Sequence, residues 1–393
     1  MPEASSWDVI SDSGNGEVIL AVDFPAAGRV EATFADLADS IGARWSHYDI
    51  LQTAPPTGPG DRNASGQEYI ERWTREIRAA GRPVAAVLGY CAGAVYTAAI
   101  ADEIGRWQQP APQVIVFDPQ VGDGPLSEEM YREMYRVLGS LLPAEKVSGA
   151  KQKAADLVVA GDGDLFDLAD ALTGFFRETA TPAFDRLSLS EAGRTHVVGL
   201  FQDYLSWLSA TTYFDPSRTW KSAWAILSTE HVANAGGNPA TTTEFGRIIT
   251  IDTTHAGVLR SESTAQKVFE QIIPGSSTEE RVPESSATIA LNDSAALNDP
   301  AALKDPAALN DPAARLETVR SIWCDVLDVN DVEDDVAFFD AGGNSMLVVA
   351  LVEKLSDASG RMLKTRDVLR APSIKAQAEL LAQQASGSAQ NAQ

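Results

Sequence analysis

The feature that most constrains this chain is a six-residue repeat that interrupts it at about three quarters of its length. A leucine, a polar residue and an aspartate recur every six residues from Leu291 to Leu309, and proline follows in three of the four units. Proline at this spacing interrupts any helix, and one leucine per unit is too little to bury. Four hexapeptide units could form a β-helix, but the absence of glycine and β-branched residues disfavours it. We therefore predict a semi-extended linker over 274–313 that separates two domains.

Length and composition agree with two domains and exclude several classes of function. A chain of 393 residues suits one domain of ordinary size and one small domain, and 44% hydrophobic residues can fill both cores. The net charge of −24 would repel the phosphates of nucleic acids and of anionic membranes. The two cysteines cannot make a disulfide framework, and the histidines and cysteines show no metal-site spacing. We expect no metal site, no membrane span and no signal peptide, and hence a cytoplasmic protein.

Upstream of the linker, apolar runs alternate with helical patterns, which is typical of a largely parallel sheet flanked by helices. We predict strands at 17–24, 46–51, 83–90, 113–117, 223–228 and 247–252, and helices at 33–41, 66–80 and 93–107. Strands are scarce between 127 and 215, where apolar residues fall at helical spacing. This insertion is either a lid over a substrate site or a set of further packing helices. The predicted domain covers 1–273.

Downstream of the linker, helical patterns at 316–327, 345–358 and 374–383 follow one another, with a long first loop. Helices of this length predict a small all-α bundle over 314–386, and we expect a disordered tail at 387–393.

The loop before the second of these helices reads Gly-Gly-Asn-Ser-Met at 342–346, after a pair of phenylalanines. Glycines clear backbone space beside Ser345, and a helix N-terminus favours a phosphodiester anion. A serine that caps a helix after a glycine turn would show the same local pattern. The stretch as a whole closely resembles the signature of acyl and peptidyl carrier proteins, with Ala341 and Met346 as mild departures. The resemblance implies a four-helix carrier domain with 4′-phosphopantetheine on Ser345, attached by a phosphopantetheinyl transferase.

A second motif, Gly-Tyr-Cys-Ala-Gly at 89–93, follows an apolar strand and opens a helix. A G-x-S-x-G nucleophile elbow requires this context, although here Cys91 replaces the serine. The helix N-terminus lowers the pKa of a thiol and presents the Ala92 N–H to a developing oxyanion. A lone cysteine is more often a small buried hydrophobe, but the flanking strand and helix favour a nucleophile.

A nucleophile of this kind needs a base that an acid orients. His255 follows the last predicted strand, where α/β-hydrolases place their histidine. Two acids are candidates: Asp118 ends the strand after the elbow helix, and Glu230 ends the following strand, which is the more general position. The remaining histidines lack this context and are expected to be structural or solvated: His47, His196 and His231.

Over about residues 15–272, this order of motifs resembles the thioesterases of nonribosomal peptide and polyketide assembly lines, an α/β-hydrolase family. The resemblance favours Asp118 as the acid and implies a second oxyanion N–H from Ala26, in the turn after the first strand. It also implies a helical lid at the insertion. The chain departs from that family in using a cysteine and in placing the carrier after the thioesterase-like domain.

The cysteine changes the expected reaction. A serine enzyme holds its acyl group as an oxoester, whereas Cys91 would hold it as a thioester, so transfer to another thiol is nearly isoenergetic. The resemblance extends to aminoacyl shuttle enzymes that use a cysteine in this way. We therefore predict an acyl or aminoacyl transferase that moves a group between phosphopantetheine thiols of donor and acceptor carrier domains. A linker of this length spans roughly 30–40 Å, which allows its own carrier to serve as donor or acceptor.

Three alternatives stay open at this point. A chain-releasing thioesterase could use Cys91 for hydrolysis or cyclisation. An amine could intercept the Cys91 thioester and form an amide. Lastly, the hydrolase-like domain could be an inactive docking platform for the carrier. The sequence does not identify the acyl group.

Overall fold

The computed structural model describes residues 5–14, 16–24, 31–45, 47–54, 65–138, 141–160, 164–234, 244–272, 311–343 and 345–390. The chain divides into two compact units. The first comprises Met1–Ala183 and Thr195–Ser276, and the second comprises Phe184–Arg194 and Ser277–Gln393. Among the helices of the described ranges, none combines the length and hydropathy that a membrane span needs.

The first unit is built on a seven-stranded sheet with the order β1-β3-β2-β4-β5-β6-β7. The strands are β1 (Trp7–Ser11), β2 (Glu17–Val22), β3 (Tyr48–Thr53), β4 (Val84–Tyr90), β5 (Gln113–Phe117), β6 (Trp224–Ser228) and β7 (Arg247–Ile251). All neighbours pair in parallel except β1, which lies antiparallel against β3 at one edge. The six predicted strands are confirmed. Strand β1 was not predicted, because only Trp7 of its five residues is buried and the segment lacks a hydrophobic alternation.

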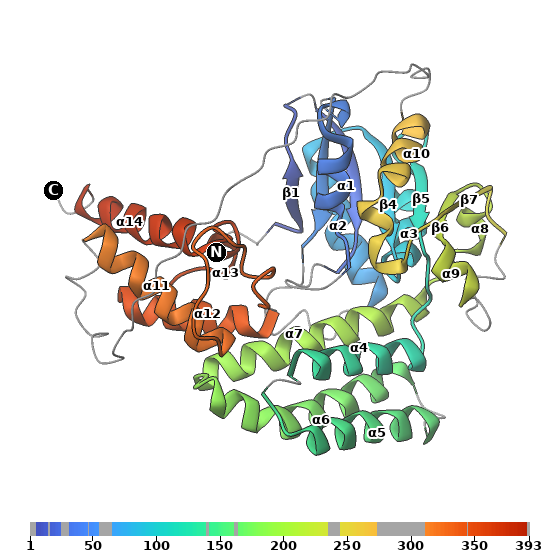
Figure 1. Cartoon of the computed structure of the whole chain (residues 1–393). Coiled ribbons are helices and arrows are strands. Elements are labelled where there is room, and N and C mark those ends of the chain that lie inside the picture. The colour runs from blue at the N-terminus through green and yellow to red at the C-terminus, as the bar shows by residue number, and fades with distance from the viewer. Residues whose placement is uncertain are drawn as a thin grey trace. The chain divides into compact units, whose positions relative to one another are not determined.

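Helices cover both faces of the sheet, because successive side chains of a buried strand point to opposite sides. On one face, Val18, Leu20 and Val22 of β2 pack in a core with α2 (Gly66–Ala80) and α3 (Gly93–Ile104). On the other face, Ile19 and Ala21 pack in a core with α1 (Phe34–Ile41) and α10 (Glu262–Ile272) (Figure 1). A parallel sheet buried on both faces explains why these strands are continuous apolar runs.

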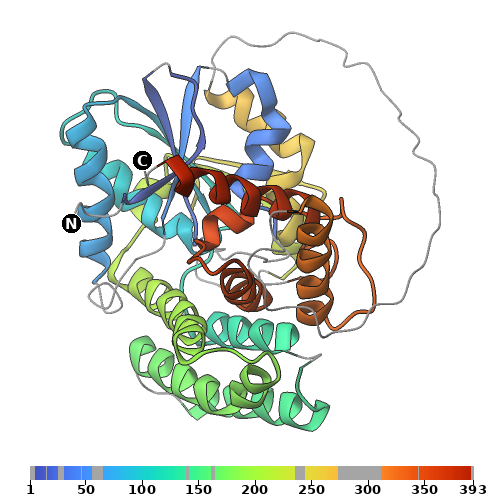
Figure 2. The same ribbon diagram turned by 90° about the vertical axis from the view of Figure 1, so that its left-hand side faces the viewer.

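Four helices are inserted between β5 and β6, and they gather as a layer at one end of the sheet (Figure 2). They are α4 (Gly124–Val137), α5 (Ala144–Ala160), α6 (Leu165–Arg186) and α7 (Glu191–Ala210). Their interior is aromatic, with Tyr131, Tyr135, Phe176 and Phe201 in mutual ring contact. The predicted helical insertion is therefore confirmed, although its first helix begins at Gly124. A mixed sheet of this order with a helical insertion gives the first unit the α/β-hydrolase fold.

The C-terminal part of the second unit is all-α, with α11 (Pro312–Leu327), α12 (Ser345–Ser359), α13 (Thr365–Leu369) and α14 (Ile374–Gln390). Its core centres on Trp323, which is fully buried, donates a hydrogen bond to Gln377 and contacts the ring of Phe338 edge-on. The predicted small helical domain is confirmed. Most of the predicted linker over 274–313 lies outside the described residues.

Candidate functional site

Cys91 occupies a strained turn between β4 and α3. Its φ of 52° lies in the left-handed region, which a residue with a side chain rarely adopts. The two flanking glycines explain why the turn can form. A Cβ on Gly89 would lie 2.3 Å from Cγ2 of Thr97, and one on Gly93 would lie 2.2 Å from the carbonyl oxygen of Val22. The spacing Gly-x-Cys-x-Gly is thus required by packing, as a nucleophile elbow demands.

The turn after β5 lies directly beside this elbow. The N–H of Cys91 donates to the carbonyl of Phe117 at 3.0 Å, and the N–H of Gln120 donates to the carbonyl of Cys91 at 3.1 Å. Asp118, between these two contacts, also has a left-handed φ, of 42°. The backbone therefore fixes the candidate acid next to the candidate nucleophile.

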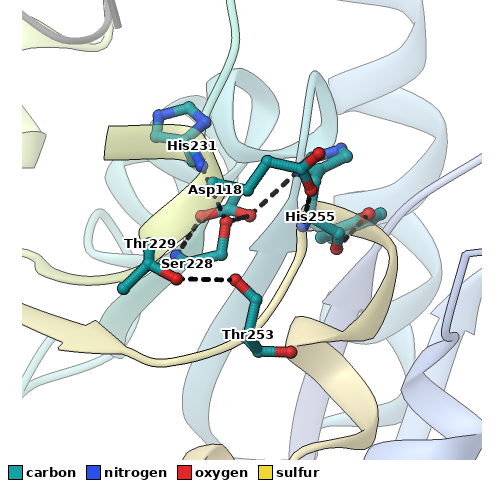
Figure 3. A network of polar contacts seen from close by, with 8 residues as sticks. Asp118, Ser228, Thr229, His231, Thr253 and His255 are labelled. Carbon is teal, nitrogen blue, oxygen red and sulfur yellow. Dashed lines mark hydrogen bonds and ion pairs between the residues drawn. The ribbon is translucent and has the colours of Figure 1, made fainter. Parts of the chain in front are cut away.

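The carboxylate of Asp118 is fully buried and accepts hydrogen bonds from two residues on other strand ends (Figure 3). The N–H of Ser228 donates to Oδ1 at 2.6 Å, and its hydroxyl donates to Oδ2 at 2.7 Å. Nδ1 of His255 lies 3.0 Å from the same Oδ2. These contacts fix the carboxylate and give the His255 ring one orientation.

The electrostatics of His255 favour a charged ring. Burial lowers its pKa, but hydrogen bonds to Asp118 and Cys91 and the negative charges of both raise the pKa to about 10. Tyr90 supports the ring from the elbow itself. Its ring stacks on that of His255 with centroids 4.9 Å apart, and its hydroxyl donates to the His255 carbonyl at 3.0 Å. These contacts favour an imidazolium between the carboxylate of Asp118 and the sulfur of Cys91.

Glu230, the other candidate acid, has a different contact with the same histidine. Its Oε2 accepts the backbone N–H of His255 at 2.6 Å. Next to it, the hydroxyl of Thr229 donates to the carbonyl of Thr253 at 3.1 Å. The structure thus brings Asp118 to the ring and Glu230 to the main chain, and α9 (Thr229–Ala233), which follows β6, is hydrogen-bonded to the loop that carries His255.

His231 also belongs to this cluster, although its sequence context predicted a structural or solvated residue. It is 8% exposed, and its ring lies nearly parallel to that of His255 with centroids 6.5 Å apart. Burial lowers the pKa of His231, the charge of Asp118 raises it and the charge of His255 lowers it. The one sequence signal for its place was its position just after a buried strand.

Of the two predicted oxyanion donors, only Ala92 is among the residues that the structure describes. Ala92 lies at the N-terminus of α3, where backbone N–H groups without helical partners point out of the helix. Ala26 lies outside the described residues.

Ser345 is the first residue of α12 and follows a turn that only glycine can make. Gly342 has a φ of 98°, and a Cβ on Gly343 would lie 2.3 Å from the ring of Phe338. The N–H of Gly343 donates to the carbonyl of Phe338 at 2.8 Å, which ties the turn to the helical core. A phosphodiester on a residue at this helix N-terminus is favoured by the helix dipole, so the turn fits a phosphopantetheine attachment site.

Comparison with protein families supports the reading of this helical domain. Residues 317–381 match the family described as "Phosphopantetheine attachment site". The domain is thus similar to carrier domains. Such a domain holds 4′-phosphopantetheine covalently, and the matched range includes the Gly-Gly-Asn-Ser turn. No curated protein matches the chain significantly.

Solved structures similar to this chain cover about two thirds of it. They include the Vlm2 thioesterase domain bound with a dodecadepsipeptide, at 15% identity over 68% of this chain and 97% of that one, with a TM-score of 0.37. The RedJ thioesterase of prodiginine biosynthesis in Streptomyces coelicolor matches at 14% identity over 66% and 91%, with a TM-score of 0.34. A carboxylesterase of the archaeon Nitrososphaera gargenis matches at 13% over 68% and 93%, with a TM-score of 0.41. At these low values, neither the activity nor the substrate of this chain follows from them.

Proposed function

We propose that this chain is an acyl or aminoacyl transferase of a nonribosomal peptide or polyketide pathway, which moves an acyl group between thiols through a thioester on Cys91. The observation that carries the proposal is the arrangement at three strand ends. Cys91 lies at a strained elbow, the turn that carries Asp118 is hydrogen-bonded to this elbow, and the buried carboxylate of Asp118 contacts the ring of His255. A carrier domain in the same chain supplies a reason for thioester chemistry.

In the first half-reaction, Cys91 acts as a thiolate paired with the His255 imidazolium. The sulfur attacks the carbonyl of an acyl thioester substrate, and the N–H groups of Ala92 and Ala26 hold the oxyanion. The carbon–sulfur bond of the substrate then breaks, and His255 gives its proton to the departing thiolate. The products are a Cys91 thioester, a free thiol and a neutral His255.

In the second half-reaction, His255 acts as the base. The negative charge of Cys91 is gone after acylation, so one cause that raises the pKa of His255 is removed. Neutral His255 takes the proton of an acceptor thiol, which attacks the Cys91 thioester and releases the Cys91 thiolate. Asp118 holds the ring in one orientation throughout and stabilises the imidazolium when it forms again.

We further propose that Ser345 bears the phosphopantetheine, and that a phosphopantetheinyl transferase attaches it. When bound, this group supplies a thiol on a flexible arm that holds acyl groups as thioesters. The linker over 274–313 would tether the domain 314–386 to the domain 1–273 at an effective concentration on the order of millimolar. Donor and acceptor carrier domains of assembly-line synthetases are the other expected partners.

Intact-protein mass spectrometry tests the proposal directly. The phosphopantetheinylated chain is mixed with an acyl-loaded donor carrier, with Cys91→Ser and Ser345→Ala as controls. We expect an acyl adduct on Cys91, followed by one on a carrier thiol. Release of the group as free acid or macrocycle would instead identify a chain-releasing thioesterase. Unchanged transfer by a Cys91→Ala chain would identify the hydrolase-like domain as an inactive platform.

A further inference from the structure

The candidate triad has a close neighbour that the proposed reaction does not use. One ligand atom each of Asp118, His231 and His255 lies within 4.8 Å of the other two. These residues come from the ends of β5, β6 and β7, so no spacing along the sequence announces the group. Asp118 and His231 are buried, and His255 is partly buried.

We propose that Asp118, His231 and His255 form a binding site for a zinc ion, which would inhibit the enzyme reversibly. Two imidazoles and a carboxylate give three protein ligands of the types that zinc accepts, with a fourth position open to water. Nitrogen ligands disfavour magnesium and calcium, which take oxygen ligands.

The surroundings of His231 support a ligand role. Its backbone N–H donates to the hydroxyl of Ser228 at 3.0 Å. Among the residues that the structure describes, however, its ring has no hydrogen-bond partner, although the residue is only 8% exposed. A ring nitrogen that no protein group occupies is available to a metal ion.

The other two ligands are held by groups that a metal site requires. Ser228 donates to both oxygens of Asp118, at 2.6 and 2.7 Å, and such contacts orient a carboxylate that binds a metal. Ligand atoms of a tetrahedral zinc site lie about 3.3 Å apart for bonds near 2.0 Å. The contact between His255 Nδ1 and Asp118 Oδ2, 3.0 Å, is already close to this value. The ring of His231, whose ligand atom lies within 4.8 Å of those of Asp118 and His255, has to move closer to both to reach this spacing.

Zinc at this site would replace the proton on Nδ1 of His255 and break its hydrogen bond to Asp118. The imidazolium would be lost, and with it the proton donor of the reaction. Since Nδ1 faces Asp118, the hydrogen bond to Cys91 uses the other ring nitrogen. Cys91 therefore lies outside the zinc site, in contrast to the thiolate sites at which zinc commonly inhibits cysteine enzymes.

Titration calorimetry on the full chain tests the proposal, with zinc chloride or magnesium chloride and without any substrate. The chain is expressed without a phosphopantetheinyl transferase, so that no arm thiol is present. We expect one equivalent of zinc to bind and magnesium not to bind. His231→Asn should weaken zinc binding by at least about 100-fold, since it removes a direct ligand. The exposed His47 is the matched control, and His47→Asn should bind zinc as the unchanged chain does.

Cys91→Ser separates this site from a thiolate site. The proposal requires the Cys91→Ser chain to bind zinc within about threefold of the unchanged chain. Loss of binding in Cys91→Ser, or unchanged binding in His231→Asn, would overturn it. If the His231→Asn chain unfolds, the His231→Gln chain is used in its place. The increase in thermal stability that zinc causes is then the measurement. The acyl adduct on Cys91 is measured separately in the presence of a chelator, so failure of either proposal is recognised independently.

Discussion

The chain contains two turns that look alike in sequence and differ in construction. A glycine stands two positions before Cys91 and two before Ser345, and each of the two residues lies at the N-terminus of a helix. At Ser345, the turn is tied to Phe338, only a few residues upstream in the same small domain. At the Cys91 site, Asp118 contacts Ser228 and His255, more than a hundred positions further along the chain, because the candidate acid and base follow different strands. The candidate carrier site is thus local, whereas the candidate acid–base pair depends on a sheet that brings distant strand ends together.

The largest effect is expected from replacing the side chain that each turn presents, Cys91 in one and Ser345 in the other. Cys91→Ala should lower acyl transfer by roughly 10⁴-fold or more, because no other group replaces the nucleophile, and should leave attachment of phosphopantetheine intact. Ser345→Ala should do the reverse: the arm is not attached, while Cys91 still accepts an acyl group from a small thioester. Intact-protein mass spectrometry measures both. An arm on the Ser345→Ala chain would show that another serine carries it.

The second prediction concerns the acid that only the Cys91 site has. Asp118→Asn should lower the rate by roughly 10²- to 10⁴-fold. Since the hydrogen bond and the charge of Asp118 both raise the pKa of His255, that pKa should fall below its value of about 10. The imidazolium then persists below about pH 10 in the unchanged chain and is lost at lower pH in the variant. Proton NMR titration of the histidine rings follows this directly.

The matched control for this variant is Asp252→Asn. Asp252 is an exposed acid at the same sheet edge and accepts a hydrogen bond from Thr229. Its loss should leave the titration of His255 where it was. An equal shift in both variants would mean that general surface charge, and not the Asp118 contact, raises the pKa.

The difference between local and long-range contacts also explains which features could be predicted from the sequence. The elbow, the strand before it and the Ser345 turn are local patterns, and the structure has each of them in place. The sequence left two candidate acids, Asp118 and Glu230, because each of them follows a strand. Their distances to His255 depend on the twist and register of the sheet, which the sequence does not give. The structure gives both acids a contact with His255, one on the ring and one on the backbone.

Other features of the structure have no recognisable pattern in the sequence. Ser228 ends a predicted strand, and nothing in the sequence indicates that it donates two hydrogen bonds to Asp118. The sequence context of His231 predicts a structural or solvated residue, but His231 lies close to Asp118 and His255, because the short helix α9 (Thr229–Ala233) begins directly after β6. Strand β1 was missed because an edge strand with few buried residues lacks the alternation that marks a strand.

The third prediction compares the glycines of the two turns. Gly93→Ala should cost about 3 kcal/mol or more, because the added Cβ meets the backbone of Val22 in a central strand, which cannot move aside. Gly343→Ala should cost about 1–3 kcal/mol, because the ring of Phe338 can shift partly. Denaturant unfolding of the two domains measures this. Gly174→Ala is the control: nothing lies within 4 Å of its Cβ position in α6, so alanine should stabilise the helix by about 0.5–1 kcal/mol.

The smallest expected effect concerns Glu230, which we interpret as a positioning residue. The short helix that begins at His255 has no side-chain cap from its own N-cap residue, Thr254, and the carboxylate of Glu230 accepts the first N–H instead. Glu230→Ala should lower kcat by about fivefold, equivalent to about 1 kcal/mol for an exposed hydrogen bond, with KM unchanged. Glu230→Gln should retain most of kcat, since its amide oxygen can still accept.

The pH profile distinguishes this role from that of a second acid. A positioning residue holds the ring in place without setting its charge, so the pKa of His255 should stay near 10 in both Glu230 variants. Glu262→Gln is the control, because Glu262 is an exposed acid in the first turn of α10, away from this loop. A fall in the pKa of His255 in Glu230→Gln would show that both acids act on the ring. Glu230 would then stabilise the charged ring of His255 as well as hold its main chain. The two acids would differ only in the size of their effect on the pKa of His255.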